Sequence, residues 1–267
     1  MIHDTRFVAH SAHEDKIERW LDIPDASTNL NKARKERHHG TGAWFLQTEE
    51  YIRWKARDYS TLWLHGIAGC GKTVLSSTVI QDLEAGQTGS EAIILYFYFD
   101  FSDARKQSFE KMVRTLAFQL NQRHEACRQR LDELYSSCKG GHEQPQGQVV
   151  VAALHDMLEM SGRVTVVLDA LDECETRKEL LSWLAVSATR PPHIFLTSRI
   201  EEDLKSSLSE WVPADCIVPV QQRAVDEDIR TVVRSVLAQD EDLNRWENRP
   251  DVRAEIENKL MEKPDGM

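Results

Sequence analysis

The stretch from Thr61 to Thr73 reads TLWLHGIAGCGKT, and it decides the fold of this chain. It opens with an apolar, strand-like run, TLWLH, and continues with a segment that fits the pattern G-x-x-x-x-G-K-[ST]. The chain then runs on to Leu83 with apolar residues at helical spacing. A strand, a glycine-rich loop and a helix in this order predict a loop whose backbone N–H groups surround phosphate oxygens.

The candidate phosphate-binding residues follow from the chemistry of such a loop. Glycines let the backbone curve so that successive N–H groups point inward, and the helix that starts at Gly71–Lys72 adds the positive end of its dipole. The Lys72 ammonium can reach the β- and γ-phosphates of a nucleotide, and the Thr73 hydroxyl can ligate Mg²⁺. We therefore expect the nucleotide to contact Gly66, Ile67, Ala68, Gly69, Cys70, Gly71, Lys72 and Thr73.

A second apolar run, RVTVVLDALDE over residues 163–173, ends in a cluster of carboxylates. Ligands of open α/β sheets lie beyond the carboxyl ends of the strands, so Asp169 is predicted to hold Mg²⁺ beside the phosphates. Asp172 and Glu173 follow where a carboxylate can orient or deprotonate an attacking water. Between these two candidate catalytic residues, Glu173 is the favoured base.

A third apolar run, HIFLTSR over residues 193–199, ends in polar residues at the same predicted edge of the sheet. An arginine at this edge can contact a terminal phosphate and respond to its presence. Arg199 is therefore a third candidate catalytic residue.

Apolar runs of this kind alternate with amphipathic segments along the chain, which predicts a parallel sheet with helices on both faces. The predicted strands are Thr61–His65, Ala92–Phe101, Arg163–Leu168, His193–Thr197 and Cys216–Val220. The residues before the first strand are polar and predict helical pieces at His13–Leu21 and Ala43–Arg57, with a break around Ile23–Asn29. The loop KGGHEQPQGQ, over residues 139–148, is expected to be mobile.

Composition restricts the function. The chain has 267 residues, of which 41% are hydrophobic, and a formal net charge of −11, so it is expected to fold without presenting a cationic face to nucleic acid or anionic lipid. No apolar run approaches the ~20 residues that a membrane span needs. Five scattered cysteines suit a reducing compartment. We expect a cytoplasmic protein without a membrane span or a nucleic-acid partner.

The three motifs together resemble those of NACHT-type signal-transducing P-loop NTPases. GIAGCGKT, VVLDALDEC and FLTSR correspond to Walker A, extended Walker B and sensor motifs, and the lead-in Trp20–Leu46 resembles the fungal nephrocystin-like N-terminal domain. The resemblance implies a three-layer αβα sandwich with a five-stranded parallel sheet of order 5-1-4-3-2. It also implies a helical lead-in at 1–39, the NTPase domain at 40–221 and, at 222–267, the start of a helical lid, which we expect to be truncated.

The resemblance implies a molecular switch that binds ATP or GTP with Mg²⁺ and hydrolyses it slowly as a weak NTPase. Members are linked to non-self recognition and programmed cell death in fungi, and they assemble into homo-oligomers or contact other protein domains when activated. Two alternatives remain open. One is a non-catalytic interaction module with a structural nucleotide; the other is a P-loop small-molecule kinase, which lacks support because no arginine-rich lid is evident.

Two weaker patterns leave further alternatives. The spacing H-x2-C-x10-C-x3-H, formed by His124, Cys127, Cys138 and His142, superficially resembles a zinc site, although a continuous helix is predicted across its first pair. The segment Gly40–Phe45 contains Trp44, and its aromatic residues can either lie against a nucleotide base or pack in the core.

Overall fold

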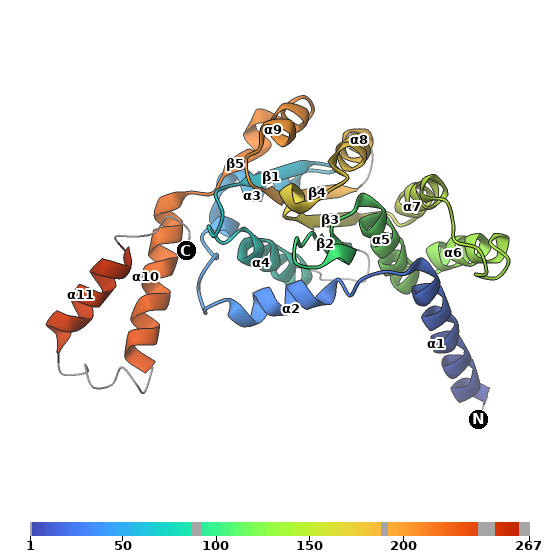
Figure 1. Cartoon of the computed structure of the whole chain (residues 1–267), viewed down its shortest axis with the longest axis horizontal. Helices are drawn as coiled ribbons and strands as arrows, with labels where there is room; N and C mark the ends of the chain where they lie inside the picture. Colours follow the sequence, from blue (N-terminus) through green and yellow to red (C-terminus); the bar gives the residue numbers. More distant parts are fainter. Residues whose placement is uncertain (1, 87–91, 188–191, 240–248, 262–267) are drawn as a thin grey trace.

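The computed structural model describes residues 2–86, 92–187, 192–239 and 249–261, with side chains from residue 12 onward (Figure 1). Five strands form one parallel sheet of order β2-β3-β4-β1-β5, which confirms the predicted order. Their bounds are Thr61–His65 for β1, Ile93–Tyr98 for β2, Val164–Asp169 for β3, His193–Ser198 for β4 and Ile217–Pro219 for β5.

The central strands are mostly apolar because both of their faces are covered. Every residue of β3 and of β4 is buried, as continuous Val, Ile and Leu runs in parallel sheets usually are. The register places His65 of β1 beside Ser198 of β4, and Leu168 of β3 beside Leu196 of β4. The carboxyl ends of β3, β4 and β1 therefore meet at one edge.

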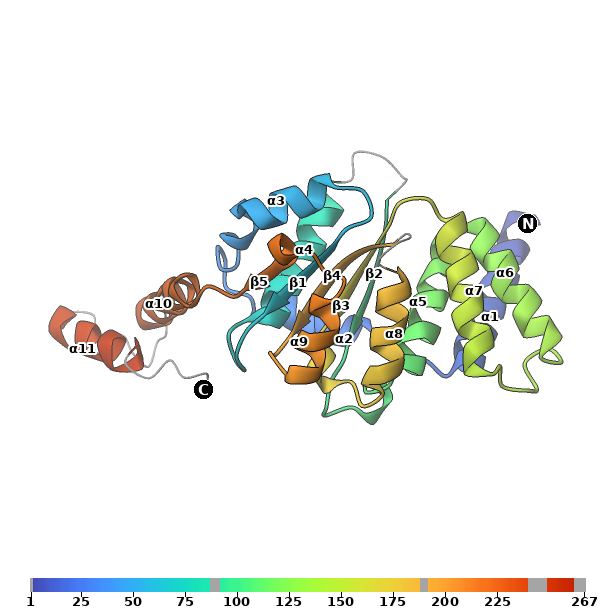
Figure 2. The same ribbon diagram turned by 90° about the horizontal axis from the view of Figure 1, so that it is seen from above.

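Helices cover both faces of the sheet. Figure 1 shows α4 and α2 below it and α8 and α9 above it, and Figure 2 shows the same two layers from above. The α-helices are α1 (Ile2–Leu21), α2 (Ser27–Glu36), α3 (Glu49–Ala56), α4 (Lys72–Ala85), α5 (Phe109–Arg123), α6 (Glu125–Ser137), α7 (Gly147–Met160), α8 (Arg177–Ser187), α9 (Glu202–Ser209), α10 (Gln222–Gln239) and α11 (Pro250–Met261). The 3₁₀ turns are η1 (Phe45–Gln47), η2 (Ala104–Lys106), η3 (Leu171–Glu173) and η4 (Ala214–Cys216). This is the predicted three-layer αβα sandwich.

Helix α2 is absent from the sequence prediction, which placed a break up to Asn29. The break is shorter, because the chain re-enters a helix at Ser27. Only Leu30 and Ala33 of this helix are buried, so its apolar stripe is too short to recognise by periodicity. The helix packs along α4, where Arg34 bonds the Glu84 carboxylate.

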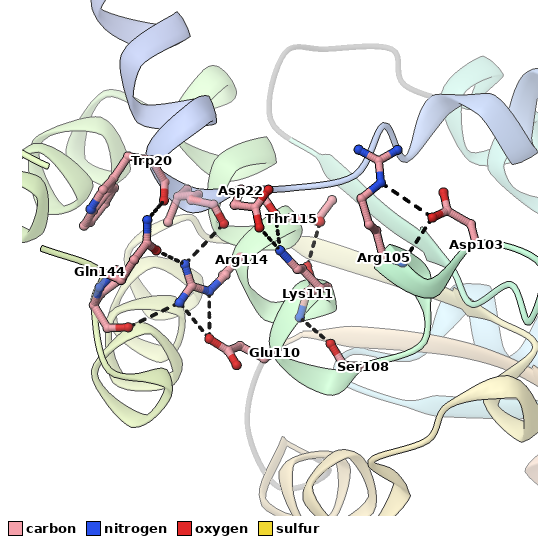
Figure 3. A network of polar contacts seen from close by, with 12 residues as sticks. Trp20, Asp22, Asp103, Arg105, Ser108, Glu110, Lys111, Arg114, Thr115 and Gln144 are labelled. Carbon is pink, nitrogen blue, oxygen red and sulfur yellow. Dashed lines mark hydrogen bonds and ion pairs between the residues drawn. The ribbon is translucent and has the colours of Figure 1, made fainter. Parts of the chain in front are cut away.

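The end of α1 is joined to α5 by a buried polar network, shown in Figure 3. The Arg114 guanidinium lies at its centre and is 6% exposed. It donates to the main-chain oxygens of Leu21 and Pro145, to the Gln144 side chain and to the Glu110 carboxylate. The loop at 139–148, which the sequence predicts to be mobile, is therefore held by hydrogen bonds to α1 and α5.

Helix α10 is tied to the segment that precedes α3. The Asp228 carboxylate accepts the Gly42 N–H at 2.8 Å and the Trp44 indole N–H at 3.0 Å. Phe45 lies in the core and contacts the ring of Phe195. Phe45 thus takes the core-packing alternative, and Trp44 links the lead-in to α10. Within the described ranges, no helix combines the length and the apolar character that a membrane crossing needs.

His193, the first residue of β4, is 3% exposed. Its ring stacks on Trp54, with centroids 4.2 Å apart, and its Nδ1 accepts the Ser60 N–H at 3.1 Å. Burial, helped by the nearby charge of Arg163, lowers the pKa of this imidazole to about 4. The fold therefore holds His193 neutral.

We predict that replacing Arg114 by alanine lowers the free energy of unfolding by about 3 kcal/mol, because buried carbonyl oxygens lose their donors. Urea denaturation measures the change. The matched control is Arg130→Ala, since Arg130 pairs with Asp156 at the surface and should contribute about 1 kcal/mol or less. Equal losses for the two variants would contradict the prediction.

Because His193 is buried in its neutral form, we predict that the free energy of unfolding falls in acid. The folded-state pKa of about 4 lies below the ordinary value of 6.5, so the unfolded chain takes up this proton first as the pH falls. The neutral His193 contributes fully to the free energy of unfolding above about pH 6.5. This contribution is lost as the pH falls towards 4, by about 3 kcal/mol in all. His193→Asn, which keeps an acceptor for Ser60, should flatten this loss in urea titrations from pH 7 to pH 4. Parallel pH dependences of the variant and the wild type would refute the assignment.

Candidate functional site at the carboxyl edge of the sheet

The loop between β1 and α4 has a backbone suited to an anion. Gly71, the N-cap of α4, has φ +83° in the left-handed region, and no side chain caps the helix N-terminus. A Cβ at Gly66 would lie 2.6 Å from the Cys70 Sγ and 3.1 Å from the Val220 Cβ, so a larger residue here would force Cys70 and Val220 to move. Backbone N–H groups and the positive end of α4 are therefore left for a ligand.

Lys72 supplies the positive charge of the loop. Its ammonium donates to the main-chain oxygens of Gly66, at 2.9 Å, and of Ile67, at 2.7 Å. These two bonds hold the charge of Lys72 against the first residues of the loop. A glycine-rich loop, an uncapped helix N-terminus and one ammonium suit the phosphates of a nucleotide.

The Asp169 carboxylate, at the end of β3, is 2% exposed and is bound by two hydroxyl groups. Thr73 Oγ1 donates to one oxygen at 2.7 Å, and Thr197 Oγ1 donates to the other at 2.7 Å. Burial raises the pKa of Asp169, while the hydroxyls of Thr197 and Thr73 favour its charged form. An all-oxygen pair of Thr73 and Asp169 suits Mg²⁺, so these two residues would hold the metal.

Thr197 is a residue of this site that the sequence reasoning missed. Its hydroxyl, fully buried, also accepts the Ala170 N–H at 3.0 Å. Ala170 has φ +58°, so the chain turns sharply after Asp169 through a conformation unusual for alanine. In the sequence, only the polar position one residue before the end of β4 hints at this role.

Asp172 and Arg199 are brought together. The side chain of Asp172 is 4% exposed; one of its oxygens accepts the Arg199 main-chain N–H at 2.9 Å and the other lies 3.2 Å from Arg199 Nε. The two candidate catalytic residues therefore form a pair, and Asp172 has no oxygen turned to open solvent.

Glu173 has a different environment. One of its oxygens accepts the Phe101 N–H at 2.8 Å, and the residue is half-buried. Burial raises the pKa of its carboxyl, and the charges of Asp172 and Asp100 act in the same direction, against the Phe101 N–H and Arg199. The other oxygen accepts no hydrogen bond from the described residues. A carboxyl with a raised pKa and such an oxygen is suited to accept a proton.

Asp172, Glu173 and Arg199 line an open cavity of about 770 Å³. Its further walls come from the start of α8 and from the residues after β4. Arg177 braces this region, because its guanidinium bonds the Glu201 and Asp203 carboxylates and the Asp172 main-chain oxygen. The candidate catalytic groups thus face a space that is walled by α8 and the loop after β4.

The zinc alternative finds no support in the described part of the chain, where no three His, Cys, Asp or Glu residues are grouped to hold a metal. Cys127 is buried, and its thiol lies 3.0 Å from the Ser161 hydroxyl and donates to the Met157 main-chain oxygen. It is a packed core residue.

Comparison with protein families gives one match. The model described as nephrocystin 3, N-terminal, matches residues 40–199, which is more than half of the chain. The matched range contains the phosphate loop, the carboxylate cluster and Arg199. No curated protein matches the chain.

Solved structures show weak overall likeness. The ORC1 protein of Aeropyrum pernix in complex with DNA gives a TM-score of 0.44 at 13% identity, over 83% of this chain and 59% of that one. A Walker-type ATPase of Pyrococcus abyssi gives 0.40 at 14% identity, over 70% and 56%. A chain of Drosophila ORC bound to AT-rich DNA and Cdc6 gives 0.33 at 12%, over 96% and 81%. This chain spans less than two thirds of the first two.

We predict that Thr197→Val destabilises the protein by about 2 kcal/mol, because the buried Asp169 carboxylate loses a donor and the Ala170 N–H loses its acceptor. Thr197→Ser, which keeps the hydroxyl, should recover most of the loss. Urea unfolding of both variants measures this. A serine variant that loses as much stability as the valine variant would contradict the prediction, because serine keeps the hydroxyl and lacks only the methyl group.

Proposed function

The chain belongs to the nephrocystin 3 N-terminal family, and from this premise we propose that it is a nucleotide-binding molecular switch. It binds ATP or GTP with Mg²⁺ and hydrolyses the nucleotide slowly. The observation that carries the proposal is the 2.7 Å contact between Thr73 and Asp169, which joins the end of the phosphate loop to the end of β3. Two oxygen ligands for Mg²⁺ thereby lie beside a loop built for phosphates.

The proposal assigns phosphate binding, metal binding and proton transfer to different residues of the site, according to their environments. The loop from Gly66 to Thr73 binds the phosphates through its N–H groups and the Lys72 ammonium. Asp169 and Thr73 hold Mg²⁺, which neutralises phosphate charge when bound. Glu173, with its raised pKa, accepts the proton of the attacking water. In this proposal Lys72, Arg199 and the metal supply positive charge to the terminal phosphate.

The signalling role extends the same proposal. Residues 40–221 act as a NACHT-like NTPase domain, and residues from 222 onward begin a helical lid that responds to the bound nucleotide. The bond between Asp228 of α10 and Gly42 supports such a response, because it connects the proposed lid to the start of the NTPase domain. The motif resemblance supports a cytoplasmic role in fungal non-self recognition or programmed cell death, with homo-oligomers or other domains as partners. The net charge of −11 supports nucleotide rather than nucleic acid as ligand.

Nucleotide binding and phosphate release test the proposal. Lys72→Ala should weaken binding of Mg–ATP or Mg–GTP at least about tenfold, because a charged donor to phosphate is lost. Glu173→Gln should bind normally and release phosphate about 100-fold more slowly. Isothermal titration calorimetry and a phosphate-release assay measure the two effects. Lys35→Ala, which removes an exposed lysine on α2, is the matched control and should behave as wild type.

Other outcomes select the alternatives. Binding without any phosphate release by the wild type would make the nucleotide structural, as in an interaction module. Phosphate transfer only when an acceptor is added would make the protein a kinase. Unchanged affinity in Lys72→Ala would refute the proposed site.

A further inference from the structure

Asp172 makes an unusual use of both carboxylate oxygens, because the same residue engages them. One oxygen accepts the main-chain N–H of Arg199 at 2.9 Å, and the other lies 3.2 Å from its Nε. The Asp172 side chain is 4% exposed, and its own main-chain oxygen is bound by Arg177. Asp172 is therefore fixed on both its backbone and its side chain, and each of its carboxylate oxygens already faces Arg199.

Only part of the Arg199 guanidinium faces Asp172. Its Nε and main-chain N–H face Asp172, whereas its two terminal nitrogens make no hydrogen bond or ion pair within the described part of the chain. The side chain is 48% exposed and lines the cavity that Glu173 also lines. A planar fork with two free N–H₂ groups matches the spacing of phosphate oxygens.

The backbone that carries Arg199 is bonded to the phosphate loop. Arg199 directly follows β4, and the main-chain oxygen of the preceding Ser198 accepts the N–H of Gly66, the first residue of the loop, at 3.2 Å. The same turn is bound to the carboxylate strand through Asp172. Arg199 is thus anchored to the ends of both β1 and β3.

We propose that Asp172 is a positioning residue, which holds Arg199 with its terminal nitrogens free for the oxygens of a terminal phosphate. The pair then sets the preference for a nucleoside triphosphate over a diphosphate, while Glu173 alone accepts the proton. This inference rests on the proposed nucleotide site. It gives separate roles to the two carboxylates of the pattern D-x-x-D-E, of which the sequence favours Glu173 as the base.

The carboxylates that line the cavity explain why Arg199 needs to be held by Asp172. Glu173, Glu201 and Asp203 also line it, so three further carboxylates lie around the cavity that Arg199 faces. A guanidinium released from Asp172 would turn to these carboxylates instead of a phosphate. Asp172 prevents this by binding the Nε side of the guanidinium.

The test compares affinities for Mg–ATPγS and Mg–ADP by calorimetry. Asp172→Asn keeps an oxygen for the Arg199 N–H and loses the charge that orients the guanidinium. We expect the ATPγS-over-ADP preference to fall about tenfold in Asp172→Asn and at least as far in Arg199→Ala. The double variant should equal Arg199→Ala alone, since both changes act through one guanidinium. Glu173→Gln should keep the preference of the wild type.

Three results would overturn the inference. The first is an unchanged preference in Asp172→Asn together with a loss of hydrolysis as large as that of Glu173→Gln, which would make Asp172 the base. The second is a fall in preference caused by Asp172→Asn in the Arg199→Ala background. The third is a wild type that binds both nucleotides equally well. Failure of the proposed function itself looks different: the wild type would bind neither nucleotide, or Lys72→Ala would bind both unchanged.

Discussion

A buried carboxylate with two hydroxyl donors is the constraint on which the rest of this site depends. Asp169 is 2% exposed, and a charge at that depth is stable only when its oxygens are bonded. Thr73 comes from α4 and Thr197 from β4, so satisfying one carboxylate fixes three elements relative to each other. The phosphate loop, the metal-binding edge and the turn that carries Arg199 are positioned as a unit for this reason.

Three neighbouring carboxylates have three different surroundings. Asp169 is bound by hydroxyls and stands beside the phosphate loop, Asp172 is bound by an arginine, and Glu173 is bound by one backbone N–H. Desolvation raises the pKa of Glu173, and the negative charges beside it add to the effect. Environments that differ in this way are how one short segment can serve metal binding, positioning and proton transfer.

Polar contacts help to hold two segments that flank the sheet, the end of α1 and helix α10. Arg114 binds the end of α1 and the loop before α7 to α5, and Asp228 binds α10 to Gly42 and Trp44. In α10, only Val225 and Leu237 are buried, so its attachment depends on few contacts. An element attached in this way can move with a modest change in free energy, as a nucleotide-dependent lid requires.

The sequence by itself determined the fold and the chemistry of the loop, because buried parallel strands read as continuous apolar runs and the phosphate loop needs glycines at fixed spacing. It missed α2, whose apolar stripe is two residues long, and it could not identify Thr197, which meets Asp169 only across neighbouring strands. The roles of Asp172 and Glu173 were likewise open, since both follow one strand. Tertiary structure gives them different surroundings, because Arg199 reaches Asp172 from the residue after β4 and Phe101 offers its N–H to Glu173 from the turn after β2.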